Sequence, residues 1–267
     1  SELRLPFGKI EIDDPLIITD KIKIKAHKRG TSIKKATTTA SVGLTRTYVD
    51  SAGVTQTLTW PDPVVFNVVC PANSYITDVQ FDGIEFDLPS DGSVGAINAQ
   101  RAFMCSFKNM FSNYSKYFFK GYDIFMTNWE NIRSRFSKDH FNITKGTSNT
   151  FITVYADKKH SSGGNGFTFK DVNYSVMGGC GADSVDRSYY FDNSNFTLNG
   201  CGTESFSRLL HAVNGSNVVV NGGSLQAVKS ATAIGIYYPY QASGAGTKVT
   251  FNGTWLGVPN PASDGGT

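Results

Sequence analysis

A six-residue phrase that recurs along the chain constrains the fold more than any other feature. Each copy has an apolar residue, then Asp, Lys or Asn, then Gly, Asn or Asp. The copies are FDGIEF at 81, FKNMFS at 107, FKDVNY at 169, FDNSNF at 191, VNGGSL at 220 and FNGTWL at 251. The wide gap between 107 and 169 holds MTNWEN at 126, a drifted copy. The other copies follow one another at 22 to 31 residues, a period typical of solenoids, propellers and arrays.

The repeat length and the local pattern favour a β-solenoid. A propeller blade needs about 40 or more residues, and the leucine ladder of leucine-rich repeats is missing. No long stretch has apolar residues at helical spacing, whereas Gly, Asn, Ser and aromatic residues are frequent. We therefore expect an all-β chain whose turns each contain two or three short strands, with Asn or Gly at corners that need left-handed backbone angles. Phe81, Phe107, Phe169 and Phe191 would stack inside the coil.

Composition excludes several classes of function. The 267 residues carry a formal net charge of +3 with 18% charged residues, so nothing indicates a nucleic-acid partner. The longest apolar runs, such as VVFNVVC at 64–70, are too short for membrane insertion. The four cysteines lack zinc-site spacing, so we expect buried free thiols and no metal or cofactor; they are Cys70, Cys105, Cys180 and Cys201. Because the chain opens on Ser1 rather than Met, we expect it to be part of a longer protein.

The opening stretch, residues 3–33, alternates apolar and polar residues and resembles the first coils of the pectate-lyase-like superfamily. An LPxG phrase and a PLxI phrase before an Ile-rich strand carry the resemblance; the matching residues are Leu5, Pro6, Gly8, Pro15, Leu16 and Ile18. The sequence departs from the family where Ala26 and Lys28 stand in place of two glycines. The resemblance implies a right-handed parallel β-helix and is silent on chemistry.

Later phrases resemble the β-helical bodies of bacteriophage tailspikes. They are TNWENI at 127–132, GTSNTFITVYAD at 146–157, GCGAD at 179–183 and GCGTE at 200–204. The combined resemblance covers most of residues 3–225. It implies a homotrimer in the virion tail that acts at the outer surface of the bacterial host, where it binds and cuts O-antigen or capsular polysaccharide.

Three acidic residues fall at the same place in three successive turns. Aligning VYAD, GCGAD and GCGTE superposes Asp157, Asp183 and Glu204. Neighbouring carboxylates would lie roughly 5 Å apart and the outer pair near 10 Å, because strands in a sheet are spaced about 4.8 Å. Retaining glycosidases need about 5 to 5.5 Å between two carboxylates and inverting ones about 6.5 to 9.5 Å. Stacked like charges also raise the pKa of at least one member, as a general acid requires.

A structural explanation of this column stays open. Turns favour Asp and Glu, and Arg187 and Arg208, each four residues after an acid, would then pair with Asp183 and Glu204. The same arginines could instead line a groove and hold sugar hydroxyls or acidic sugars. His211 follows Arg208 closely and would join that groove.

Other residues give weaker candidates. Four aromatic residues could stack on sugar rings, although core packing is the commoner role of each: Tyr155, Tyr189, Trp129 and Trp255. A charged cluster forms a reserve site: Glu130, Asp139 and Arg133. His140 and His160 lack metal-ligand spacing, and we assign them to the surface or to turns.

These observations predict an organisation and a function. The regions are the first coils at 1–33, an inserted loop or hairpin at 34–63, the main body at 64–225, and a last coil with the start of a C-terminal region at 226–267. The expected function is endo-hydrolysis of a bacterial surface polysaccharide, with Asp157, Asp183 and Glu204 as acid and base or nucleophile. Three alternatives stay open: a polysaccharide lyase on the same fold, a glycan-binding adhesin without activity, and a structural virion module.

Overall fold

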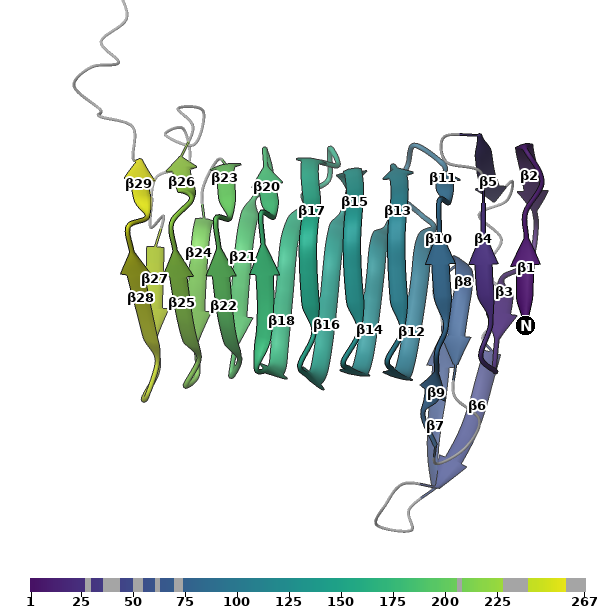
Figure 1. Ribbon diagram of the computed structural model, residues 1–267, viewed down its shortest axis with the longest axis horizontal. Helices are drawn as coiled ribbons and strands as arrows, with labels where there is room; N and C mark the ends of the chain where they lie inside the picture. The colour runs from purple at the N-terminus through teal and green to yellow at the C-terminus, as the bar shows by residue number, and fades with distance from the viewer. Residues whose placement is uncertain are drawn as a thin grey trace, which may run out of the picture.

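The computed structural model describes residues 1–26, 30–35, 44–49, 55–60, 63–69, 74–205, 208–227 and 240–257. Every regular element in these ranges is a β-strand, and the strands stack side by side into one elongated solenoid (Figure 1). No helix in the described ranges is long and apolar enough to span a membrane. The expected all-β solenoid is confirmed; it has about nine turns.

Two parallel sheets run the length of the solenoid. The strands of the first sheet are β1 (Glu2–Arg4), β2 (Gly8–Ile12), β4 (Lys23–Lys25), β5 (Thr31–Lys35), β10 (Gln80–Asp82), β11 (Glu85–Asp87), β13 (Ser106–Asn113), β15 (Asn128–Ser137), β17 (Thr150–Lys159), β19 (Ser175–Gly178), β20 (Gly181–Asp183), β22 (Asn195–Asn199), β23 (Gly202–Ser205), β25 (Asn217–Asn221), β26 (Ser224–Ala227), β28 (Lys248–Asn252) and β29 (Trp255–Gly257). Those of the second are β3 (Leu16–Ile18), β8 (Val64–Val69), β9 (Ile76–Thr77), β12 (Gly95–Phe103), β14 (Tyr117–Phe125), β16 (Asp139–Thr147), β18 (Asn165–Asn173), β21 (Arg187–Asp192), β24 (Arg208–Val213) and β27 (Tyr240–Ser243).

A third, two-stranded sheet projects from the N-terminal end of the solenoid (Figure 1). It consists of β6 (Leu44–Val49) and β7 (Thr55–Trp60), which pair antiparallel. This hairpin falls within the 34–63 stretch that interrupts the early coils. The solenoid resumes at β8, which pairs with β3 on one side and β12 on the other.

The recurring phrase marks a bend with a left-handed residue. In each copy the apolar residue points inward, and the residue two positions later has a positive φ, as at Gly83, Asn109 and Asn193. Only Gly, and to a lesser degree Asn and Asp, adopts that conformation readily. The prediction that Asn or Gly occupies these corners is therefore confirmed at the positions named, although Thr153 occupies one such position with φ 53°.

Two details of the repeat were wrong. Phe169 and Phe191 lie in β18 and β21, opposite one another on the second sheet, whereas the other copies belong to the first. The same left-handed bend occurs on both sheets, so one phrase marks two positions of each turn. The drifted copy begins at Trp129 rather than at residue 126, because Trp129 is in register with Phe107 and Phe151.

Stacked aromatic rings fill the interior. Trp129 lies between Phe107 and Phe151, with ring centroids 5.9 and 4.4 Å away. On the facing sheet, Phe167 lies 5.4 Å from Tyr189 in a second stack. All five side chains are fully buried. Trp129 and Tyr189 are therefore core residues, and their assignment to sugar stacking was wrong. The core placement of Phe81, Phe107, Phe169 and Phe191 is confirmed.

Candidate functional site

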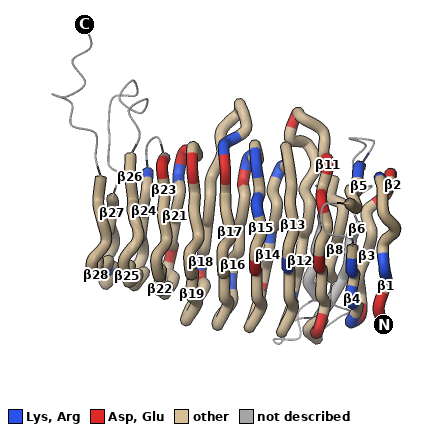
Figure 2. Tube along the Cα trace, turned by 45° about the horizontal axis from the view of Figure 1, so that its top comes forward, with Lys and Arg blue, Asp and Glu red and all other residues tan. Residues whose placement is uncertain are grey.

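Three carboxylates occupy equivalent positions in β17, β20 and β23. Asp157 is in register with Asp183, and Gly181 with Gly202, which places Glu204 at the next level. The Glu204 N–H donates a hydrogen bond to Asp183 Oδ1 at 3.0 Å. Neighbouring members are thus one strand spacing apart, about 4.8 Å. The predicted column exists, at an edge of the solenoid where charged positions gather (Figure 2).

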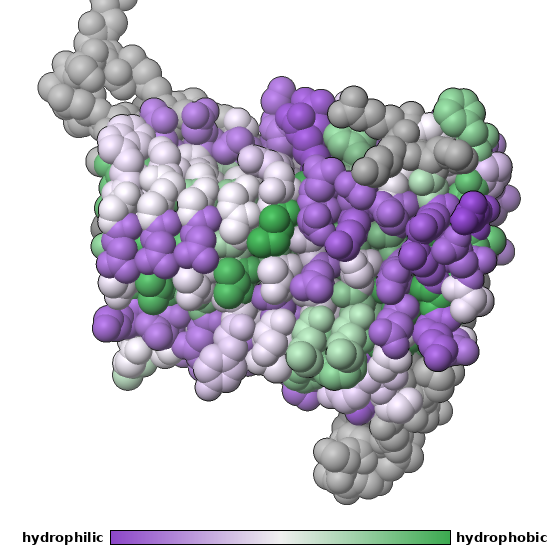
Figure 3. Space-filling model, in the orientation of Figure 1, coloured by the Kyte–Doolittle hydropathy of each residue, from purple (hydrophilic) through white to green (hydrophobic). Residues whose placement is uncertain are grey.

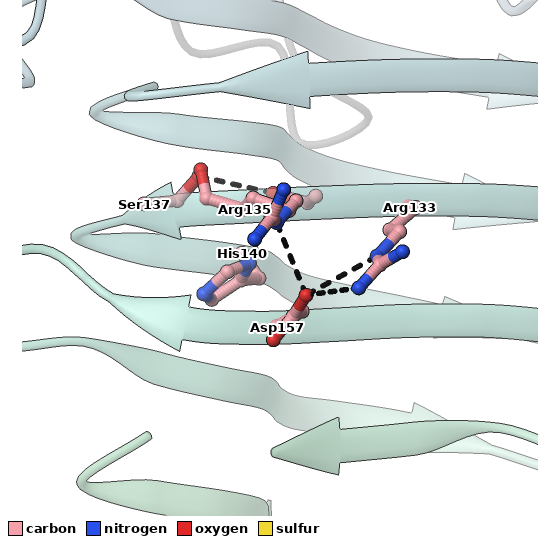
Figure 4. Close-up of polar contacts among 6 residues, drawn as sticks. Arg133, Arg135, Ser137, His140 and Asp157 are labelled. Carbon is pink, nitrogen blue, oxygen red and sulfur yellow. Dashed lines mark hydrogen bonds and ion pairs between the residues drawn. The ribbon is translucent and has the colours of Figure 1, made fainter. Parts of the chain in front are cut away.

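Asp157, at one end of the column, is held by two arginines of the preceding turn. Its Oδ2 lies 2.5 Å from Arg133 Nη2 and 3.1 Å from Arg135 Nε (Figure 4). The Asp157 side chain is only 13% exposed. Ion pairs with two arginines of the preceding turn therefore fix the position of the Asp157 carboxylate beside Asp183.

Asp183, in the middle of the column, has the opposite electrostatics. Burial raises the pKa of the Asp183 carboxyl above its ordinary value, and the neighbouring Glu204 and Asp157 carboxylates raise it further. The Glu204 N–H and Arg133 oppose the shift without cancelling it. Glu204 is exposed to solvent. The column thus holds an ion-paired acid, an acid whose pKa is raised by burial and an exposed acid.

The raised pKa of Asp183 predicts a pH-dependent effect on stability. A carboxyl whose folded pKa exceeds its unfolded value of about 3.9 stabilises the fold at low pH, and this contribution is lost as pH rises through the folded pKa. Asp183→Asn imitates the protonated form and still accepts the Glu204 hydrogen bond. We expect the Tm of Asp183→Asn, relative to wild type, to increase between pH 3.5 and 7. A constant difference measured by differential scanning calorimetry would contradict the assignment.

A groove opens beside Asp183 and Glu204. It encloses about 350 Å³, and glycines, Cys180 and Cys201 form its floor. Gly179 and Gly200 have φ of +56° and +60°, and a Cβ on either would enter open space. The surface over β20, β23 and β26 is correspondingly pale in the hydropathy view (Figure 3). The glycines leave the backbone accessible beneath the carboxylates.

Aromatic rings bound this groove along the solenoid axis. The outward column of the second strand in each turn reads Tyr155, Gly181, Gly202, Ser224 and Trp255. Tyr155 is 40% and Trp255 55% exposed. The two rings are four strand spacings apart, about 19 Å. Of the four aromatic candidates, the structure leaves these two at the surface, on either side of the groove.

A second cavity continues from Tyr155 toward the N-terminal end. It measures about 530 Å³ and shares Tyr155 with the first. Arg133 and Glu85 line it together with Asn109, Asn131 and Phe111. The two cavities form a trough that follows the column of left-handed bends. Tyr155 lies where the two meet, and Arg133, which pairs with Asp157, lines the second cavity.

Arg187 and Arg208 do not pair with the acidic column. They are neighbours in β21 and β24, past the corner and on the second sheet. His211 lies on the same sheet, edge-on to Tyr190 at 5.6 Å. The predicted ion pairs with Asp183 and Glu204 are therefore wrong, as is the placement of these residues in the groove. Each arginine follows its acid by four positions, and the three residues between Asp183 and Arg187 form a corner that turns the two side chains to different faces.

The three residues of the reserve cluster, Glu130, Asp139 and Arg133, do not form one site in the structure. Glu130 lies on the first sheet and pairs with Lys108 at 2.6 Å. Asp139 lies on the second sheet and accepts a hydrogen bond from Asn165 at 2.7 Å. Arg133 instead joins Asp157. The sequence did carry a signal for the Arg133 and Arg135 contacts, because both arginines lie about one 22-residue turn before Asp157, but it was missed.

His140 is a buried core residue, so its assignment to the surface was wrong. Its Nδ1 lies 2.9 Å from Ser134 Oγ, and Ser134 contacts Ser137, which contacts Ser115. Burial lowers the pKa of His140 to about 4, so the ring is neutral at neutral pH. This polar chain lies behind Asp157 and fixes the corner between β15 and β16.

The cysteines and the other potential ligands form no metal site. Cys105, Cys180 and Cys201 are buried free thiols, as predicted, and Cys70 lies outside the described residues. Across the part of the chain that the structure describes, no group of three His, Cys, Asp or Glu side chains could hold a metal ion.

Comparisons with known proteins match this chain by its fold alone. No protein-family model matches the sequence, and no curated protein sequence matches it significantly. The structure is similar to the Acinetobacter phage vb_AbaP_AS12 gp42 tailspike, with a TM-score of 0.68, 14% identity and coverage of 96% of this chain and 56% of that one. It is also similar to ORF18 of Geobacillus virus E2, with a TM-score of 0.57, 10% identity and coverage of 96% and 52%.

A third similar structure is the A-module of the Azotobacter vinelandii mannuronan C-5 epimerase AlgE4. Its TM-score is 0.50 at 12% identity, with coverage of 97% of this chain and 86% of that one. At these identities the likeness establishes the fold: the chain is a phage tailspike-like parallel β-helix. The chain spans about half the length of the two phage proteins.

Proposed function

We propose that this chain is the β-helical body of a phage tailspike that binds and hydrolyses a bacterial surface polysaccharide, either O-antigen or capsule. The observation that carries the proposal is a column of stacked carboxylates with different surroundings beside an open groove. Burial raises the pKa of Asp183, while Asp157 is ion-paired with Arg133 and Arg135. Such a difference between neighbouring carboxylates is the basis of acid–base catalysis at glycosidic bonds.

The environments suggest a role for each acid. Asp183 would donate its proton to the leaving-group oxygen, and the exposed Glu204 would attack the sugar or activate water. Asp157 would hold a negative charge near the developing oxocarbenium ion and keep Asp183 protonated. Since Asp157 is engaged by two arginines, we favour the Asp183–Glu204 pair. The backbones of the two residues are one strand spacing apart, about 4.8 Å, which would allow the carboxylate separation of about 5 to 5.5 Å that retaining enzymes use.

The trough would hold the polysaccharide along the solenoid axis. Tyr155 and Trp255 offer exposed rings for the apolar faces of sugars. The glycine floor lets a chain approach the backbone between them. By analogy with the similar tailspike, we further propose that the chain is part of a homotrimer in the virion tail.

A lyase is the second candidate, and one observation favours it. Arg133 and Tyr155, both of residue types that serve as lyase bases or charge neutralisers, line the trough together. Incubation with a panel of purified bacterial surface polysaccharides separates the candidates. New reducing ends without near-ultraviolet absorbance support hydrolysis, whereas products that absorb there would indicate a lyase. Retention of a glycan without new ends would indicate an adhesin.

A further inference from the structure

The second sheet carries a pair of arginines that the acidic column does not use. Arg187 and Arg208 are register neighbours in β21 and β24, so their backbones lie about 4.8 Å apart. Like charges directly opposite one another in a sheet are destabilising. Consistent with this, Arg208 acts to lower the pKa of Arg187, after the larger effect of burial.

No acid among the described residues forms an ion pair with either arginine. Asp186, next to Arg187, pairs with Lys159 at 2.5 Å. Asp139 acts on Arg187 electrostatically, but it lies two strands away and accepts a hydrogen bond from the intervening Asn165.

Arg187 is held in place without being neutralised. Its guanidinium carbon lies 4.1 Å from the centroid of the Tyr190 ring, which fixes the planar group. Its Nε is buried and has no hydrogen-bond partner. A buried donor without a partner is costly, and a guanidinium group presents donors in a geometry that matches a carboxylate. The position is thus preorganised for an oxyanion.

His211 contributes to the same surface. It lies in β24 beside Tyr190, where burial and then Arg208 lower its pKa. A neutral imidazole adds a hydrogen-bonding group without adding another positive charge. The surface therefore combines two cations, one aromatic ring and one neutral imidazole around a space open to solvent at Arg208, which is exposed.

We infer that Arg187 and Arg208 form a binding site for the carboxylate of an acidic sugar, so that the polysaccharide substrate contains uronic acid or another carboxylated residue. The inference rests on the proposed polysaccharide-binding function and adds the chemical class of the glycan. A chain lying in the groove at Asp183 would reach these arginines by crossing the corner between β20 and β21. A carboxylate between the two guanidinium groups would relieve their repulsion.

The test uses uronic-acid-containing capsular polysaccharides, each paired with its carboxyl-reduced form. In affinity electrophoresis we expect the wild type to bind an acidic polymer at least about tenfold more tightly than its reduced form. Arg187→Gln/Arg208→Gln should lose this preference, whereas Arg4→Gln, which removes one arginine from β1 at the far end of the solenoid, should keep it. Thermal unfolding checks the fold, and removing two repelling charges should not lower the Tm.

Several outcomes would overturn the inference. They are equal affinity for acidic and reduced polymers, an unchanged preference in the double variant, or suppression of binding by free sulfate as effectively as by free glucuronate. Release of reducing ends from neutral polymers alone would also reject the acidic-sugar site while leaving the proposed hydrolase intact. Failure to bind or cut any polysaccharide would instead reject the proposed function itself.

Discussion

Asp183→Asn is expected to abolish most polysaccharide hydrolysis while leaving the solenoid folded. The amide occupies the same volume and keeps the hydrogen bond from the Glu204 N–H, but it cannot protonate a leaving group. General acid catalysis contributes about 10²- to 10⁴-fold to a rate, so kcat should fall by that factor. Glu204→Gln should produce a loss of similar size. Both are measured as reducing ends released per unit time at saturating polymer.

Asp87→Asn is the matched control for this pair of variants. Asp87 lies four turns before Asp183 in the same column. Asn113, Arg135 and Asp157 occupy the equivalent position in the three turns between them. It pairs with Lys9 at the surface, away from the groove at Asp183. The control should retain the activity of the wild type. Equal losses in Asp87→Asn and Asp183→Asn would mean that the column acts through general electrostatics and has no catalytic centre.

Trp129→Ala should cause the largest loss of stability of any single substitution considered. The indole is fully buried between Phe107 and Phe151 and also meets Phe119 edge-on at 5.2 Å. Replacing a buried Trp by Ala typically lowers the free energy of unfolding by about 3 to 5 kcal/mol. Urea denaturation followed by circular dichroism measures this change.

Trp255→Ala separates core packing from ligand stacking. Trp255 is 55% exposed and lies at the rim of the groove. Its removal should cost less than about 1 kcal/mol of unfolding free energy, while weakening glycan binding. If Trp129→Ala instead kept its stability but bound glycan poorly, Trp129 would belong to the sugar-binding surface. That result would contradict its register with Phe107 and Phe151 inside the solenoid.

The solenoid could be predicted because its bends require residues that adopt left-handed backbone angles, and these residues recur along the sequence with the period of the turns. An inward aromatic residue followed two positions later by a left-handed one recurs wherever the chain bends, as at Phe107 and Asn109. Which of two bends a copy belongs to could not be predicted, because both use the same phrase. Phe169 and Phe191 therefore belong to a different bend from Phe81 and Phe107, although all four are buried as predicted.

The stacking of Asp157, Asp183 and Glu204 could also be predicted, because aligned phrases one turn apart must lie side by side. The ion-pair partners of these acids could not be predicted in the same way. Arg187 follows Asp183 by four residues, but the intervening corner includes Ser184 with φ 55° and sends the two side chains to different faces. A separation of four residues therefore gave the wrong ion-pair partner. A separation of one turn, such as the 22 residues between Arg135 and Asp157, gives the right one.

The central claim, hydrolysis at the Asp183–Glu204 pair, is tested most directly by digesting a susceptible surface polysaccharide in ¹⁸O-labelled water. Mass spectrometry of the fragments then reports the fate of the solvent oxygen. Hydrolysis places one ¹⁸O at each new reducing end, and this label should disappear with the products in Asp183→Asn. Unlabelled, unsaturated fragments from the wild type, or full labelling by Asp183→Asn, would contradict the account.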